Sequence, residues 1–252
     1  SKDNNIEQIP TDNFDALLID ANCLLHPQCF KVLADNPKLT NKIELENKMI
    51  EGCIEYLNYI IEYSDPKKLI YIAIDGVAPI AKIKQQRMRR FKSVHDRELF
   101  NNIKRKHNKE ISNFWNNSAI TPGTVFMEKL KFKIINYCKK IKKEKNLKVI
   151  FSSSNTPSEG EHKLLQYIRD KQKKNKNDKT KYAIYGLDAD LIFLALSTNK
   201  EDIFLVREAT HLNEKGGNNF DMLNFVSIDI MKSCIYSKMS KMIIKKNELD
   251  IK

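Results

Sequence analysis

The sequence lacks the patterns of a disulfide-stabilised, zinc-binding or membrane-spanning protein. Its five cysteines are scattered, and no two of them form a C-x-x-C pair, so neither structural zinc nor a disulfide framework is expected. No apolar run approaches the ~18 to 20 residues of a membrane-spanning helix, and no signal peptide opens the chain. We therefore expect an intracellular protein without a membrane partner, cytoplasmic or nuclear, with the cytoplasm slightly favoured.

Acidic residues are fewer than basic ones. The 252-residue chain has 44 lysines and arginines against 32 aspartates and glutamates, a net charge of +12. Such a surplus favours a polyanionic partner, nucleic acid first. The alternative is a nucleotide bias in the gene, since lysine, asparagine and isoleucine are all abundant. Charge alone leaves both interpretations open.

Short apolar runs alternate with helical patterns along the chain. The runs predict strands at residues 16–19, 69–74, 148–152, 182–187 and 203–206, and the helical patterns lie at 44–63, 80–116, 125–143, 162–173 and 189–197. The long polar helix at 80–116 is expected to break near Ser93. Residues 171–181 and 213–219 are expected to be solvated loops. This alternation predicts an α/β fold with a parallel central sheet flanked by helices. No repeat or linker divides the chain, so we predict one domain over residues 1–252.

Acidic residues follow four of the predicted strands. In an open parallel sheet the carboxyl ends of the strands line one crevice, so these carboxylates are expected to meet: Asp20, Asp75, Glu159, Glu161, Asp188 and Asp190. So many like charges need cations, and oxygen ligands suit Mg²⁺ or Mn²⁺. Two ions about 4 Å apart can hydrolyse a phosphodiester. The alternative is that each acid merely caps the helix that follows it.

A basic helical face begins directly after Asp75. The spacing i, i+4, i+7, i+8 places Lys82, Gln86, Arg89 and Arg90 on one side of a helix. Their donors suit a phosphate group, although a solvated charged face is the usual explanation for such a run. His26 follows Asp20 by six residues and could stack on a base or transfer a proton, or be structural. Trp115, the single tryptophan, is expected to pack in the core.

Other hydrolytic chemistries have no support in the sequence. There is no G-x-S-x-G pattern for a serine nucleophile and no histidine and cysteine set with metal-ligand spacing.

These motifs, in their order and rough spacing, resemble those of the Xrn-type 5′→3′ exoribonucleases over about residues 6–226. The similar segments are DANCLLHP at 20–27, the segment 75–90, ITPGTVFM at 120–127, SEGEHK at 158–163, YGLDADLI at 185–192 and LVRE at 205–208.

The resemblance implies a fold and a set of roles. The fold would be the nuclease core shared with flap endonucleases and PIN domains. The six acids would hold two catalytic Mg²⁺ ions, and Lys82, Gln86, Arg89 and Arg90 would bind the 5′-monophosphate of single-stranded RNA. Asn22 and His26 would contact RNA, with His26 stacked on a base. Capped or triphosphorylated RNA would be refused. No particular protein partner is implied.

Some features depart from the family's pattern. Ser158 stands where the family usually has glycine, and Ile80 where it commonly has a basic residue. No Met-Gly-x-Pro-x-Phe-Phe start is present, and the family's further acidic segment would follow Lys252. We therefore expect a single nuclease domain trimmed at both ends. A flap-type endonuclease and a non-catalytic RNA-binding module of the same fold are the alternatives to an exoribonuclease.

Overall fold

A six-stranded sheet forms the centre of the protein. The computed structural model describes residues 14–109, 115–209 and 222–249. The strand order is β3-β2-β1-β4-β5-β6, and the strands are β1 Ala16–Asp20, β2 Leu69–Ala73, β3 Lys148–Ser152, β4 Tyr182–Tyr185, β5 Ile203–Glu208 and β6 Leu223–Ser227. The first five run parallel, while β6 pairs antiparallel with β5. The predicted α/β class with a parallel central sheet is confirmed.

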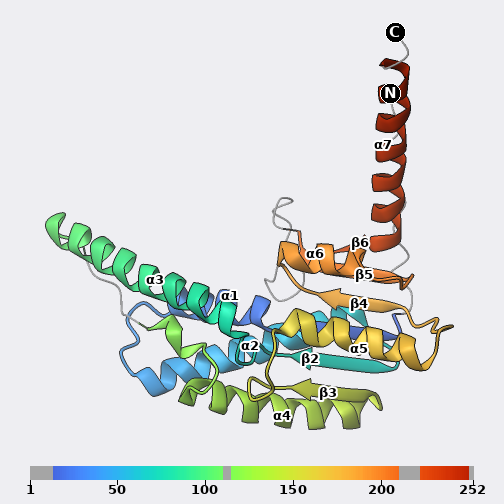
Figure 1. The fold of residues 1–252 in the computed structure, drawn as a ribbon. Coiled ribbons are helices and arrows are strands. Elements are labelled where there is room, and N and C mark those ends of the chain that lie inside the picture. The colour runs from blue at the N-terminus through green and yellow to red at the C-terminus, as the bar shows by residue number, and fades with distance from the viewer. Residues whose placement is uncertain (1–13, 110–114, 210–221, 250–252) are drawn as a thin grey trace, which may run out of the picture.

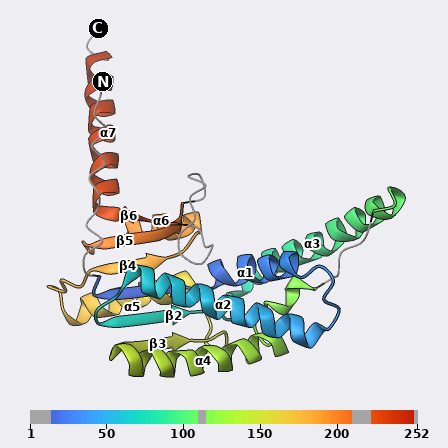
Figure 2. The ribbon, with the colours of Figure 1, turned by 180° about the vertical axis from the view of Figure 1, so that it is seen from behind.

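Helices cover both faces of this sheet. Helices α1 (Asn22–Asp35), α2 (Lys42–Ser64) and α4 (Val125–Lys145) lie on one face, and α5 (Gly160–Lys174) and α6 (Ala189–Leu196) on the other (Figures 1 and 2). Strand β1 shows why two cores form: Leu17 and Ile19 pack into the first layer, whereas Ala16 and Leu18 pack into the second. Successive strand residues point to opposite faces, so a strand buried on both sides is apolar throughout.

Local capping fixes where the helices begin and end. The Asn41 side chain accepts hydrogen bonds from the N–H groups of Ile43 and Glu44 at the start of α2, and the Thr124 hydroxyl accepts one from Met127 at the start of α4. The residues directly after α2 and α4, Asp65 and Asn146, have positive φ angles of 38° and 50° respectively. A left-handed residue of this kind is a common helix terminator.

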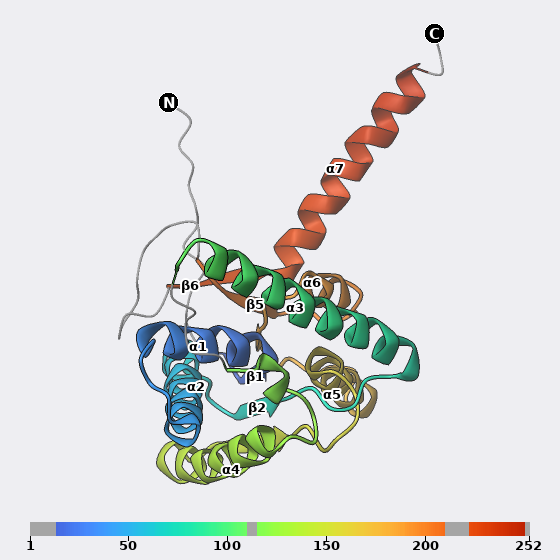
Figure 3. The same cartoon turned by 90° about the vertical axis from the view of Figure 1, so that its left-hand side faces the viewer.

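Two helices extend away from the layered body. Helix α3 (Ile80–Lys106) crosses the carboxyl edge of the sheet and continues beyond it (Figures 1 and 3), and none of its residues is buried. Helix α7 (Ile228–Leu249) follows β6 and projects from the other end of the molecule. In the described residues no helix is both long and apolar enough to cross a bilayer.

Several predicted boundaries are wrong. Helix α3 has no break at Ser93, and it ends at Lys106 rather than at residue 116, just before Asn108 adopts a φ of 50°. Helix α5 continues to Lys174, into the predicted loop 171–181, because lysine and glutamine are good helix formers. Helix α1, strand β6 and helix α7 were not predicted. The loop predicted at 213–219 lies outside the described residues.

A half-buried acidic residue of β5, Glu208, joins helix α2 to the sheet. The hydroxyls of Tyr56 on α2 and Tyr185 on β4 each donate to Glu208 Oε1 at 2.5 Å. Burial, with Glu208 beside it, raises the pKa of the Tyr185 phenol well above its ordinary value. The tyrosine therefore stays a neutral donor to the acid.

We predict that Tyr185→Phe lowers the free energy of unfolding by about 1 to 3 kcal/mol, since it removes one hydrogen-bond donor from the partly buried Glu208 side chain. Urea denaturation would measure the change. Tyr236→Phe is the matched control, because Tyr236 is 75% exposed on α7, and this change should be nearly neutral. Equal effects of the two substitutions would show that the Glu208 bond contributes nothing.

Candidate active site

The ends of two strands and the starts of two helices bring six acidic residues to one edge of the sheet. Asp20 is the last residue of β1, and Asp75 follows β2, the neighbouring strand. Glu159 directly precedes α5 and Glu161 lies in its first turn. Asp188 caps α6 by accepting from the N–H of Asp190, which lies in the first turn of that helix. The structure thus places all six predicted acids on the predicted edge.

Gly160 allows these segments to approach closely. Its N–H donates to Asp75 Oδ1 at 2.6 Å. A Cβ atom at this position would lie 2.5 Å from Asp20 Oδ1, closer than any real contact. The Glu-Gly-Glu sequence therefore has a steric reason: only glycine lets the start of α5 touch both carboxylates at the strand ends.

Burial and mutual repulsion raise the pKa values of these acids. Asp20 is 6% exposed, and burial, then the charge of Asp75, raises its pKa to about 7. Burial, then the charge of Asp188, likewise raises the pKa of Glu161 to about 7. The pKa of Asp75 is also raised, chiefly by burial, against the hydrogen bond from Gly160. At neutral pH the cluster needs protons or cations to offset its charge.

The residues of the cluster fit a divalent cation. Glu161 Oε2 is buried and receives no hydrogen bond from the described residues, so one carboxylate oxygen has its acceptor capacity free. Glu159, Glu161 and His162 can place one ligand atom each within 4.8 Å of one another. The other acids add only oxygen atoms, the ligands that Mg²⁺ and Mn²⁺ prefer.

Lys82 belongs to the acid cluster in this structure. Its ammonium contacts both carboxylate oxygens of Glu159, at 2.6 and 2.7 Å, and the hydrogen bond to Glu159 raises the lysine pKa. We predicted that Lys82 would bind phosphate together with Gln86, Arg89 and Arg90. The structure separates it from them: those three line a cavity that Lys82 does not line.

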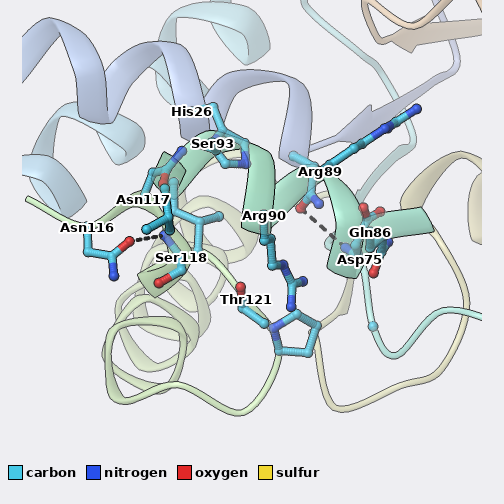
Figure 4. A pocket seen from close by; sticks show the side chains of 15 residues that line it. His26, Asp75, Gln86, Arg89, Arg90, Ser93, Asn116, Asn117, Ser118 and Thr121 are labelled. Atoms are coloured by element: carbon cyan, nitrogen blue, oxygen red, sulfur yellow. Dashed lines mark hydrogen bonds between the residues drawn. The ribbon is translucent and has the colours of Figure 1, made fainter. Parts of the chain in front are cut away.

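That cavity, of about 360 Å³, lies beside the acids. Asn22 and His26 of α1 line it together with Asp75, and α3 contributes Gln86, Arg89 and Arg90 (Figure 4). Arg90 points toward Thr121 on the far wall. The structure therefore brings together the predicted base-contacting and phosphate-binding residues, Lys82 excepted.

Asn22 links the cavity to the acids. Its side-chain oxygen accepts a hydrogen bond from the N–H of Asp75, at 3.3 Å, and its own N–H donates to Asp20 Oδ1, at 3.2 Å. Across the cavity from Asp75, His26 is half-buried, and burial lowers its pKa, against the charge of Asp75. A neutral imidazole there is suited to stacking on a base.

One wall of the cavity was not predicted from the sequence. It is formed by a short 3₁₀ helix, η1 (Asn117–Ala119), the residue before it and the turn after it, which supply Asn116, Asn117, Ser118 and Thr121. The Asn116 side chain accepts from the Ser118 N–H at 3.1 Å, which shapes this wall (Figure 4). The available signal was a polar run next to the predicted turn at residues 121–124. Trp115, just before this run, is buried against Phe126, as predicted.

Two further residues position the acids of α6 and were also missed. Arg207 on β5 donates to the Leu187 carbonyl at 2.6 Å. The Leu187 N–H donates to the Cys23 sulfur at 3.3 Å. Both contacts hold the residue directly before Asp188.

Comparison with known proteins gives matches over most of the chain. A family model described as "XRN 5'-3' exonuclease N-terminus" matches residues 1–209. The "5'-3' exoribonuclease 2" of Kluyveromyces lactis is 35% identical over 240 residues, 85% of this chain and 23% of the relative. The "5'-3' exoribonuclease 1" of Saccharomyces cerevisiae is 38% identical over 208 residues, 80% of this chain and 13% of the relative. The "5'-3' exoribonuclease 2" of Arabidopsis thaliana is 37% identical over 224 residues, 82% of this chain and 22% of the relative. The chain spans less than a quarter of the length of these relatives.

The raised pKa of Asp20 predicts that the free energy of unfolding of the metal-free protein depends on pH. A chelator keeps the protein free of metal in this experiment. Its carboxyl titrates near 3.8 when unfolded and near 7 when folded, so the folded protein is destabilised as pH rises between these values and not beyond. Asp20→Asn mimics the protonated acid. Urea denaturation in chelator should show the two proteins alike near pH 4 and the variant more stable at pH 7 to 8, by a few kcal/mol in order of magnitude. A pH-independent difference would contradict the shift.

We also predict that Gly160→Ala destabilises the protein and weakens divalent-ion binding at least ~10-fold, because its methyl group displaces Asp20. Helix propensity alone would favour alanine by up to about 1 kcal/mol. Gly52→Ala in α2 is the matched control, since its added Cβ would meet only a Val32 methyl, at 3.2 Å. Urea denaturation and Mn²⁺ titration would measure both variants. Unchanged Mn²⁺ affinity in Gly160→Ala would contradict the prediction.

Proposed function

Because the chain belongs to the XRN 5'-3' exonuclease family through its N-terminal region, we propose that it is the nuclease core of a metal-dependent 5′→3′ exoribonuclease that acts on 5′-monophosphorylated single-stranded RNA. The fold expected from the resemblance, an α/β nuclease core of the PIN and flap-endonuclease kind, is confirmed. The observation that supports the proposal most is the position of Asp75. It is part of the acid cluster and also lines the cavity that contains the arginines.

The acid cluster is the proposed site of hydrolysis. Asp20, Asp75, Glu159, Glu161, Asp188 and Asp190 would hold two Mg²⁺ or Mn²⁺ ions. When bound, such ions make water a better nucleophile and stabilise the leaving oxygen of a phosphodiester. The protein's contribution is to hold the carboxylates in place, and the contacts of Asp75 with Gly160 and Asn22 do this directly.

The cavity is the proposed site of the 5′-terminal nucleotide. Gln86, Arg89 and Arg90 supply an amide and two guanidinium groups for the terminal phosphate. His26 offers its ring to the base, while Asn22 and Asp75 form the side of the cavity next to the acids. A 5′ phosphate in this cavity would put the next phosphodiester toward Asp75, so cleavage would release the terminal nucleotide.

Lys82 lies between the two parts of the site. In the structure its ammonium neutralises Glu159. If Glu159 held a cation, that ammonium would be available to a substrate phosphate. Such a change of partner would be compatible with both the predicted phosphate-binding role and the observed ion pair.

Cleavage of matched RNAs that carry a 5′ monophosphate or a 5′ hydroxyl tests the function. With Mg²⁺, we expect mononucleotides to be released from the 5′ end of the phosphorylated RNA and the hydroxyl RNA to persist. Asp188→Asn should abolish release. Equal decay of both RNAs, decay from the 3′ end, or release of intact 5′ flaps from branched DNA would overturn the proposal. RNA binding without cleavage would indicate a non-catalytic module.

We predict that Arg90→Gln raises the KM for 5′-phosphorylated RNA by about 10- to 100-fold, the range expected for a lost hydrogen bond between charged groups. Residual turnover of 5′-hydroxyl RNA should not change. Arg87→Gln is the matched control, because Arg87 is exposed on α3 and does not line the cavity. Steady-state kinetics on both RNAs would measure the effect. An equal loss on both substrates would exclude recognition of the terminal phosphate.

A further inference from the structure

A buried lysine connects three elements directly behind the acid cluster. Lys163, in the first turns of α5, is 8% exposed. Its ammonium donates to the carbonyl of Ile74 at 2.7 Å and to the carbonyl of Ser153 at 3.1 Å. Ile74 directly precedes Asp75, and Ser153 directly follows β3. One side chain thus ties the ends of β2 and β3 to the helix that carries Glu161.

The charge of Lys163 faces the same carboxylates. Burial lowers the pKa of the ammonium, while Asp75 and Asp20 act in the opposite direction. A buried cation is costly unless it is paired or hydrogen-bonded, and here two carbonyls and the acids fulfil that need. Lys82 differs in kind, because its ammonium is partly exposed and bonds to the Glu159 side chain. Lys82 can leave its partner, whereas Lys163 is held by backbone groups.

We propose that Lys163 is a positioning residue of the divalent-ion site, an inference that rests on the proposed metal-dependent function. Its ammonium fixes the peptide bond before Asp75 against α5. The Asp75 carboxylate is thereby held beside Gly160, the first residue of α5. Lys163 contacts neither the substrate nor the reacting atoms in this role.

The direction in which metal affinity changes when Lys163 is neutralised distinguishes a positioning role from a purely electrostatic one. A fixed cation beside a metal site weakens metal binding by Coulomb repulsion, so its removal would tighten binding. Loss of a residue that orients metal ligands typically weakens binding or activity by about 10- to 100-fold. The proposal therefore requires that a neutral replacement bind the ion more weakly, against the electrostatic expectation.

The test is Mn²⁺ binding by Lys163→Met without RNA, followed by electron paramagnetic resonance. We expect affinity to fall about 10- to 100-fold. With 5′-phosphorylated RNA and saturating Mg²⁺, kcat should fall while KM stays within about twofold, because Lys163 does not line the cavity. Lys173→Met, an exposed lysine of the same helix, should match the wild type. Unchanged or tighter Mn²⁺ binding in Lys163→Met would overturn the proposal.

A second variant covers the case in which Lys163→Met does not fold. Lys163→Arg keeps the charge and the N–H donors but is longer, so it should fold while pushing the Ile74 carbonyl away from α5. Weaker Mn²⁺ binding with unchanged RNA affinity would support positioning, and wild-type Mn²⁺ binding would overturn it. A wild-type chain that binds Mn²⁺ but cleaves no RNA would overturn the proposed function alone. A wild-type chain that binds no Mn²⁺ would overturn both.

Discussion

Repulsion among buried carboxylates is the constraint on which the rest of this structure depends. Asp20 and Glu161 both have pKa values raised to about 7, by burial first and by neighbouring acids second. A sequence selected for stability alone would not gather such groups at the edge of a sheet. The fold nevertheless keeps them together with fixed groups: the Gly160 and Asn22 contacts to Asp75, and the ammonium of Lys163 behind it. A cation bound among these carboxylates would offset their mutual repulsion.

The sequence was sufficient to predict this cluster because a simple rule governs it. Apolar runs that end in an acid place that acid at the carboxyl edge of a parallel sheet, whatever the details of packing. Asp20, Asp75 and Asp188 needed only this rule. The helix α1 was missed because Pro27 lies inside it, and an internal proline normally argues against a helix. The wall formed by Asn117 and Ser118 was missed because these residues line the cavity only as a result of how α3 is placed across the sheet. Local sequence does not specify that placement.

Lys82 shows the same limit inside the site. Helical spacing correctly predicted that it shares a face of α3 with Gln86, Arg89 and Arg90. It could not predict that this face spans two environments, with Glu159 beside the first turn and the cavity beside the later ones. Periodicity defines which side chains point the same way, whereas their partners depend on what lies opposite along the helix axis. An exposed helix such as α3 has no buried residues that would reveal those neighbours in the sequence.

The position of Asp75 accounts for the directional activity proposed for the chain. A cluster of acids alone would cut any phosphodiester that reached it, and a basic cavity alone would only bind. The peptide of Asp75 is held by Asn22 from the cavity side, and its carboxylate by Gly160 from the acid side. The two parts are therefore fixed relative to each other through one residue at the end of β2. Residues of η1 and Thr121 line this cavity together with Arg89 and Arg90, so under the proposed function a strand would enter until its terminal phosphate met the arginines. A fixed distance between the arginines and the acids would then make the cut a property of the strand's end rather than of its sequence.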